Sequence, residues 1–122
     1  MLPITSTVAA LAAVGLIALS VPVSLRRMQV KQAIGMGDDP GLLRRIRAQG
    51  NFIEYVPVAL ILLALAELRG APQIFVFAIA GSLVIGRTAH AIGMMGGVKP
   101  LRRMGMMATF ISLLAGVAAQ FV

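Results

Sequence analysis

The sequence predicts an all-α integral membrane protein, an antiparallel four-helix bundle formed by a single domain over residues 1–122. Two observations predict it. The chain is 59% hydrophobic and 12% charged, with a mean hydropathy of +0.94, whereas a soluble domain is about half apolar and roughly a quarter charged. It also contains four apolar segments, each close to the roughly 20 residues that cross a bilayer as a helix.

The four expected spans are separated by short polar connections. The first span carries its basic run, "RRMQVK", after the apolar stretch and not before it, unlike a secretory signal peptide, so it is expected to remain as a helix. "GMGDDPG" and "GMMGGVKP" interrupt the first and third connections, and "RGAPQ" forms a tight turn with Pro72 at a helix start. Short connections favour antiparallel neighbours. The expected spans are residues 2–25, 43–68, 73–95 and 104–122.

Basic residues cluster at two of the three connections, and the net charge is +7. The positive-inside rule places the first and third connections in the cytoplasm and both termini outside it. Because these residues lie between apolar runs and not over a soluble face, nucleic-acid binding is not expected. The residues at the two connections are Arg26, Arg27, Lys31, Arg44, Arg45, Lys99, Arg102 and Arg103.

The chain contains no cysteine, which excludes disulfides, thiolate metal sites and a protein thiol nucleophile. Any sulfur chemistry would have to use a thiol on the substrate. Missing cysteines and minimal loops suit a bacterial inner membrane.

Small residues recur along three spans and predict close helix packing. Ala108, Ser112 and Gly116 are spaced four residues apart, which would let another backbone approach. The other small residues are Ala9, Ala13, Gly81 and Gly86. They could serve packing within one chain or contacts between subunits, and the pattern does not separate the two.

A polar stripe begins the second span. Arg47, Asn51, Glu54 and Tyr55 share one helix face, and Gln49 points roughly the other way. Ionisable residues inside a span usually face a bundle interior or a water-filled cavity. Pro57, which lies beside the stripe in the same span, predicts a kink there. A second interpretation is an interfacial ladder in which Arg47 pairs with Glu54 or extends to the headgroups.

The third span has a matching pair, Arg87 and His90, three residues apart and toward the same membrane side. The two stripes together predict a positively charged cavity at the cytoplasmic interface for a small polar anion. His90 alone could equally be a packing residue. No HExxH, Ser-His-Asp set or phosphate-binding glycine loop is present, so no metal site is expected.

These motifs carry a resemblance. "RAQGNFIEYVP" resembles the second-helix signature of the MAPEG family, the membrane-associated proteins in eicosanoid and glutathione metabolism, whose core is Arg-x-x-x-Asn-x-x-Glu. "GRTAH" resembles the third-helix segment of one branch of that family. Length, spans and loop placement fit over essentially the whole chain.

The resemblance implies a homotrimer that binds glutathione in clefts between subunits. It implies that polar residues of the second and third spans hold the tripeptide. A further arginine, Arg26 or Arg27, would come from the end of the first span. Guanidinium groups suit the two carboxylates of glutathione, and an acidic group suits its amine. The implied contacts are Arg47, Asn51, Glu54, Tyr55, Arg87, His90 and, more weakly, Gln49.

The resemblance also implies thiol activation by an arginine near the start of the fourth helix. Matching the proline in "KPLRR" selects Arg102, with Arg103 as the alternative. A cation lowers a thiol's pKa from about 8.5. The sequence departs from the family at Met94, where relatives have tyrosine. The implied function is a glutathione transferase or peroxidase for lipophilic electrophiles. The alternative is a non-catalytic protein that binds a lipid or another ligand.

Overall fold

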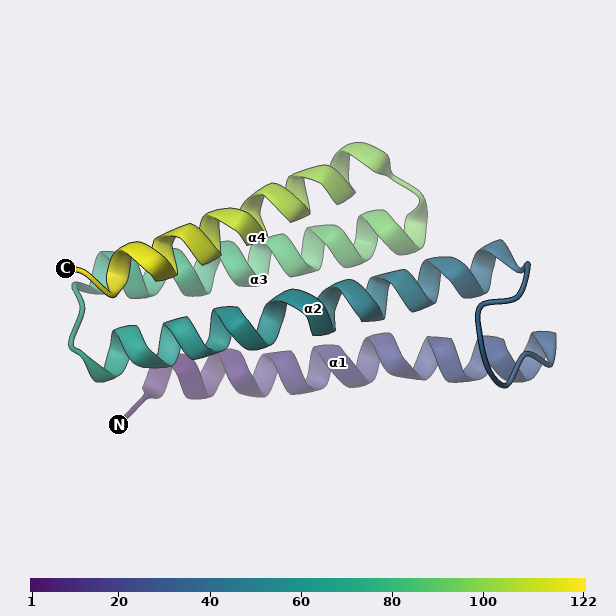
Figure 1. The fold of residues 1–122 in the computed structure, drawn as a ribbon, viewed down its shortest axis with the longest axis horizontal. Helices are drawn as coiled ribbons and strands as arrows, with labels where there is room; N and C mark the ends of the chain where they lie inside the picture. The colour runs from purple at the N-terminus through teal and green to yellow at the C-terminus, as the bar shows by residue number, and fades with distance from the viewer.

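The computed structural model describes residues 1–122 and contains four α-helices and no strands. They are α1 (Pro3–Val30), α2 (Pro40–Leu68), α3 (Gln73–Gly96) and α4 (Lys99–Ala119). The helices run antiparallel in sequence order, with α1 beside α2 and α3 beside α4 (Figure 1). All four are long and apolar enough to cross a membrane. The predicted all-α bundle is confirmed.

The helices are longer at their basic ends than the apolar segments predicted. Helix α1 continues to Val30, and α4 begins at Lys99 and ends at Ala119. Helix α3 includes most of "GMMGG", so only Gly97 and Val98 separate it from α4. Hydropathy marks the part of a helix that suits lipid, whereas helical hydrogen bonding continues into the polar interface, and the predicted boundaries were wrong there.

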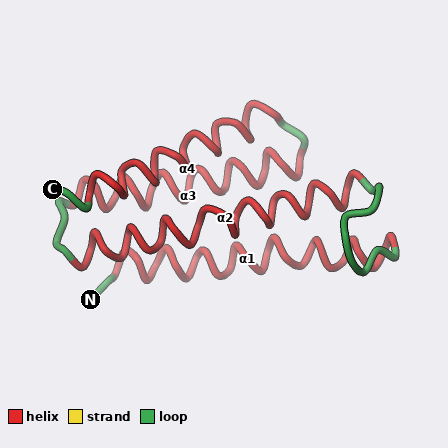
Figure 2. Tube along the Cα trace, viewed as in Figure 1, coloured by secondary structure: helices red, strands yellow, loops and turns green.

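The longest connection, residues 31–39, and two short turns complete the fold (Figure 2). The turn at residues 69–72 forms as predicted, and Gly97 adopts a left-handed φ of 72° at the end of α3. At the opposite membrane side, Glu67 accepts hydrogen bonds from the amides of Ile4 and Thr5 at 2.9 and 2.7 Å. The carboxylate therefore joins the start of α1 to the end of α2.

The apolar core lies mainly between α2 and α3. It is small because most large apolar side chains point outward, as expected for helices that face lipid or other subunits. Helix α2 continues through Pro57, which is exposed. The core consists of Val8, Val56, Ala59, Leu63, Ala66, Val76, Ile79, Ala80, Leu83 and Ala119.

Helices α3 and α4 pack backbone to backbone through glycines. A Cβ added to Gly86 would lie 2.9 Å from the Gly105 carbonyl oxygen, and one on Gly105 would lie 2.7 Å from the Cα of His90. Gly93 faces the backbone of Arg102 in the same way. Only glycine permits this approach, so these positions set the distance between the two helices.

The small residues of α4 pack within the chain. Ser112 is buried and donates a hydrogen bond of 2.8 Å to the Ile79 carbonyl, and Gly116 lies against Leu62. Gly81, in contrast, has no side-chain or backbone neighbour at its Cβ position. Ser112 and Gly116 therefore pack within one chain, whereas Gly81 faces outward.

Candidate functional site

The polar stripe of α2 occupies one helix face, but its members differ in burial. Asn51 is buried, Tyr55 is partly buried, and Arg47 and Glu54 are exposed. Arg47 Nη1 lies 3.5 Å from Glu54 Oε1, and about half of each side chain is accessible. The pair bridges two turns of one helix and leaves both charges open to a neighbouring molecule.

Tyr55 and Gln49 orient the stripe relative to the other helices. The Tyr55 ring meets Phe110 of α4 edge to face, with centroids 5.7 Å apart. Gln49 Nε2 donates a 2.8 Å hydrogen bond to Ser20 Oγ of α1. Gln49 therefore points toward α1, away from the α4 side on which Tyr55 lies, as the helical spacing predicted.

Arg87 links α3 to the buried part of the stripe. Its Nη2 donates to Asn51 Oδ1 at 2.5 Å, and its Nη1 donates to Thr109 Oγ1 of α4 at 3.4 Å. The residue is only 7% exposed. Arg87 and Asn51 thus form a polar link across three helices beneath the more exposed Arg47 and Glu54.

His90 lies one turn further along α3 and is almost fully buried. Its backbone packs on Gly105, and its Nδ1 has no hydrogen-bond partner. The sequence placed Arg87 and His90 on one face. In the structure the Arg87 side chain hydrogen-bonds toward α2 and α4, whereas the backbone of His90 lies against the start of α4.

The arginines at the end of α1 both have partners within the chain. Arg26 Nε and Nη2 each donate to the Asp39 carboxylate at 2.8 Å. Arg27 donates to the carbonyls of Gln32 and Gly35. The two bonds from Arg26, with a third from the Leu42 amide, lower the pKa of Asp39 from 3.8 to about 2. These contacts fasten the long connection to α1.

The two arginines near the start of α4 differ in exposure. Arg102 is partly buried, with its backbone against Gly93, whereas Arg103 is exposed. Adjacent helix positions point about 100° apart, so the two guanidinium groups leave the helix in different directions. Met94 is partly buried in the last turns of α3. No group of His, Asp and Glu residues could hold a metal ion.

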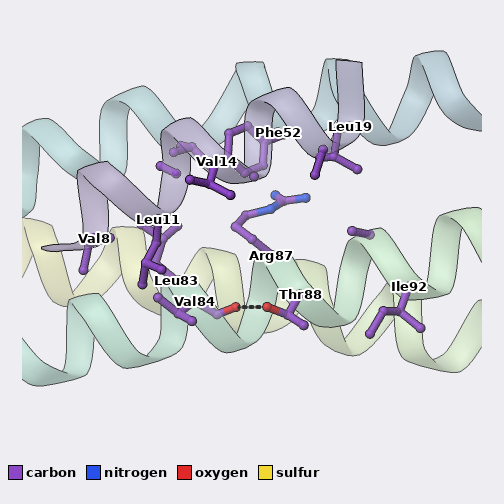
Figure 3. A pocket seen from close by; sticks show the side chains of 15 residues that line it. Val8, Leu11, Val14, Leu19, Phe52, Leu83, Val84, Arg87, Thr88 and Ile92 are labelled. Atoms are coloured by element: carbon purple, nitrogen blue, oxygen red, sulfur yellow. Dashed lines mark hydrogen bonds between the residues drawn. The ribbon is translucent and has the colours of Figure 1, made fainter. Parts of the chain in front are cut away.

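Sequence reasoning missed an apolar cavity between helices. It lies between α1 and α3, has a volume of about 380 Å³, and contains Arg87 as the one charged lining residue (Figure 3). On α1 its wall follows one helix face through Val8, Leu11, Gly15 and Leu19. That spacing is visible in the sequence, but an apolar helix face in a membrane protein does not by itself distinguish a cavity from lipid contact.

Comparisons with known proteins agree with this architecture. The model of the MAPEG family matches residues 5–122. The inner membrane protein YecN of Escherichia coli strain K12, and the protein of that name in Escherichia coli O6:H1 strain CFT073, are each 35% identical to this chain over 116 residues. The aligned region covers 95% of this chain and 88% of each relative. The chain therefore belongs to the MAPEG family of membrane proteins.

Proposed function

We propose that the protein is a glutathione-dependent membrane transferase or peroxidase that acts on lipophilic electrophiles. Glutathione would bind in a cytoplasm-facing cleft between the subunits of a homotrimer. The observation that carries the proposal is the Arg47–Glu54 pair, two half-exposed charges within a membrane-spanning helix.

Contact with lipid is unfavourable for such charges, because a charged side chain within a span is stable only beside protein, water or a polar ligand. A second copy of the chain would shield this face of α2. Glutathione offers carboxylates for Arg47 and an amine for Glu54. Asn51, the buried residue of the same face, would add a further contact to glutathione, and the hydrogen bond from Arg87 holds its side chain in place.

Arg102 would activate the thiol. A guanidinium beside the sulfur favours the thiolate, which is the nucleophile. With an aryl chloride, the thiolate forms a sulfur–carbon bond and chloride leaves. With a lipid hydroperoxide, the thiolate attacks the terminal oxygen and the oxygen–oxygen bond breaks, so that the lipid leaves as its alcohol; a second glutathione then releases the other oxygen as water and forms the disulfide.

The similarity to inner membrane proteins supports a place in a bacterial inner membrane. The basic connections support an orientation with both termini outside the cytoplasm. The cleft would then face cytoplasmic glutathione, and the lipophilic substrate would enter from the bilayer.

A non-catalytic ligand-binding role is the second candidate, favoured by Met94 at the position where the family resemblance implies a tyrosine. Turnover separates the two. Purified protein with glutathione and chlorodinitrobenzene should release chloride and form the conjugate. Arg102→Ala should lower turnover much more than glutathione affinity and reduce thiolate absorbance near neutral pH, because the lost interaction acts on the thiolate.

Arg103→Ala is the matched control, since it removes the same charge from the adjacent position. Equal, mild effects of both substitutions would mean that these arginines only anchor the helix at the headgroups. Glutathione binding without any turnover of the natural protein would favour the non-catalytic role.

A further inference from the structure

The hydrogen bonds of Arg87 all run in one direction, because a guanidinium donates and cannot accept. Its Nη2 donates to Asn51 of α2 at 2.5 Å, and its Nη1 donates to Thr109 of α4 at 3.4 Å. Its third nitrogen, Nε, is buried. The guanidinium is therefore committed to two other helices, in contrast to the direct glutathione contact that the family resemblance implies for Arg87.

The contact with Arg87 fixes which way the Asn51 amide faces. An asparagine side chain has an accepting oxygen and a donating NH2 group, and only the oxygen can meet a guanidinium. The NH2 group is therefore turned away from Arg87. Asn51 keeps 8% of its surface exposed, and on its helix face it lies between Arg47, four residues before it, and Glu54, three residues after it. The donating end of the amide thus belongs to the face that carries the two half-exposed charges.

Thr109 completes the arrangement from α4. Its hydroxyl donates to the Gly105 carbonyl at 2.8 Å, which leaves its lone pairs to accept from Arg87. The three hydrogen bonds join α2, α3 and α4, and each has only one permitted direction. Thr109 is fully buried, so its side chain cannot touch a ligand itself. Any effect of Thr109 on ligand binding must pass through Arg87 and Asn51.

We propose that Arg87 and Thr109 are positioning residues of the glutathione cleft, which hold Asn51 so that its NH2 group donates to a glutathione carboxylate. The inference rests on the proposed glutathione site. Because a carboxylate only accepts, a reversed amide would present its oxygen to the ligand and repel it. A side chain that is already fixed also loses less rotamer freedom when the ligand binds.

Calorimetry of glutathione binding to the full-length protein in detergent tests the part played by Thr109. Thr109→Val keeps the shape of the side chain and removes its hydroxyl, so affinity should fall about threefold, and Thr109→Ser should restore it. Ser112→Ala is the matched control, because Ser112 is another fully buried hydroxyl of α4 that bonds to α3. It should bind glutathione normally. Equal losses in Thr109→Val and Ser112→Ala would mean that any loosening between these helices weakens binding, and would contradict the proposal.

A double-mutant cycle separates positioning from direct contact. Arg87→Lys keeps the positive charge but loses the fork that reaches two partners, so it should weaken binding about three- to tenfold. In Asn51→Ala protein, which has no amide to position, the same change should have no further effect. Losses that multiply would show that Arg87 touches glutathione itself and would overturn the proposal. The Thr109 variants keep the test decisive if Arg87→Lys fails to fold.

Asn51→Asp should make stability and affinity move apart. Aspartate has the same shape and still accepts from Arg87, so helicity and the unfolding midpoint should persist. It has lost the donor and repels a carboxylate, so glutathione affinity should fall roughly tenfold or more. Unchanged affinity in a well-folded Asn51→Asp protein would mean that Asn51 only packs against Arg87, which would also overturn the proposal.

Asn51 is the only asparagine of the chain, so isotopic labelling of asparagine gives a single side-chain amide signal in nuclear magnetic resonance spectra. Added glutathione should shift the two protons of this NH2 group in the natural protein, and shift them less in Thr109→Val. Glutathione that binds without moving the signal would contradict the proposed orientation and leave the glutathione site intact. Absence of glutathione binding by the natural protein would contradict the glutathione site itself, and the positioning with it.

Discussion

Two pairs of neighbouring helices are packed in different ways. Helices α3 and α4 meet through the backbones of Gly86 and Gly105, so close that a single added carbon at either position would overlap the other helix. Helices α1 and α3 leave a cavity of about 380 Å³ between them. Helix α1 is instead held by polar contacts with Glu67 near its start, with Gln49 at Ser20, and with Asp39 at Arg26 near its end.

This difference separates a rigid part of the molecule from an adaptable one. Backbone contact at Gly93 and Gly105 fixes the backbones of Arg102 and His90 relative to each other, which the proposed thiol activation by Arg102 would require. The α1 side, held by polar contacts before and after the stretch from Val8 to Leu19, leaves an apolar space along that stretch.

The largest expected effect concerns the tight pair. Gly105→Ala should destabilise the protein by about 1–3 kcal/mol, because the new methyl group meets the rigid backbone of His90 and the helices must separate. The midpoint of unfolding, followed by helicity in mixed dodecylmaltoside–SDS micelles, measures this change.

Gly81→Ala is the control for helix propensity. Gly81 lies in α3, the other helix of the pair, but nothing surrounds its Cβ position, so alanine should be neutral or stabilise the helix by up to about 1 kcal/mol. If Gly105→Ala behaved like Gly81→Ala, the backbone contact would not determine the packing of α3 on α4.

A smaller effect is expected at the Arg26–Asp39 pair, which holds the end of α1. The Arg26 hydrogen bonds hold the pKa of Asp39 at about 2, below its ordinary 3.8. The carboxylate therefore contributes its stabilisation fully above about pH 4 and loses it as the pH falls through about 2. The amide resonance of Leu42, which donates to Asp39, should shift in that window.

Asp39→Asn should remove this titration, whereas Asp38→Asn, at the exposed neighbouring position, should leave it unchanged. A Leu42 resonance that titrated near the ordinary carboxyl pKa would show that the Arg26–Asp39 pair does not persist in the membrane-embedded protein.

The two regions also differ in how far the sequence predicted them. Hydropathy identified all four helices, because membrane helices need long apolar segments. The helical period placed Arg47 and Glu54 on one face, and the structure has them 3.5 Å apart. Such features depend on a single helix and can be derived from spacing alone.

The sequence predicted features that depend on two helices less well. Gly93 lies inside the expected span 73–95 and also in "GMMGGVKP", which was interpreted as a break, and neither pattern indicates its contact with Arg102. The Arg87–Asn51 hydrogen bond and the α1–α3 cavity depend on how each helix is rotated about its axis. That rotation follows from packing against neighbours, which spacing within one segment does not specify.

The most direct test of the proposed function is glutathione binding by calorimetry, with the natural protein, Arg47→Ala and Glu54→Ala in the same detergent. Each substitution removes a charged contact worth about 1.5–3 kcal/mol, so each should weaken binding by roughly tenfold or more while helicity persists. Arg69→Ala, which removes a charge at the opposite end of α2, should bind normally. Unchanged affinity in well-folded Arg47→Ala and Glu54→Ala proteins would show that the pair is an interfacial ladder and would contradict the glutathione site.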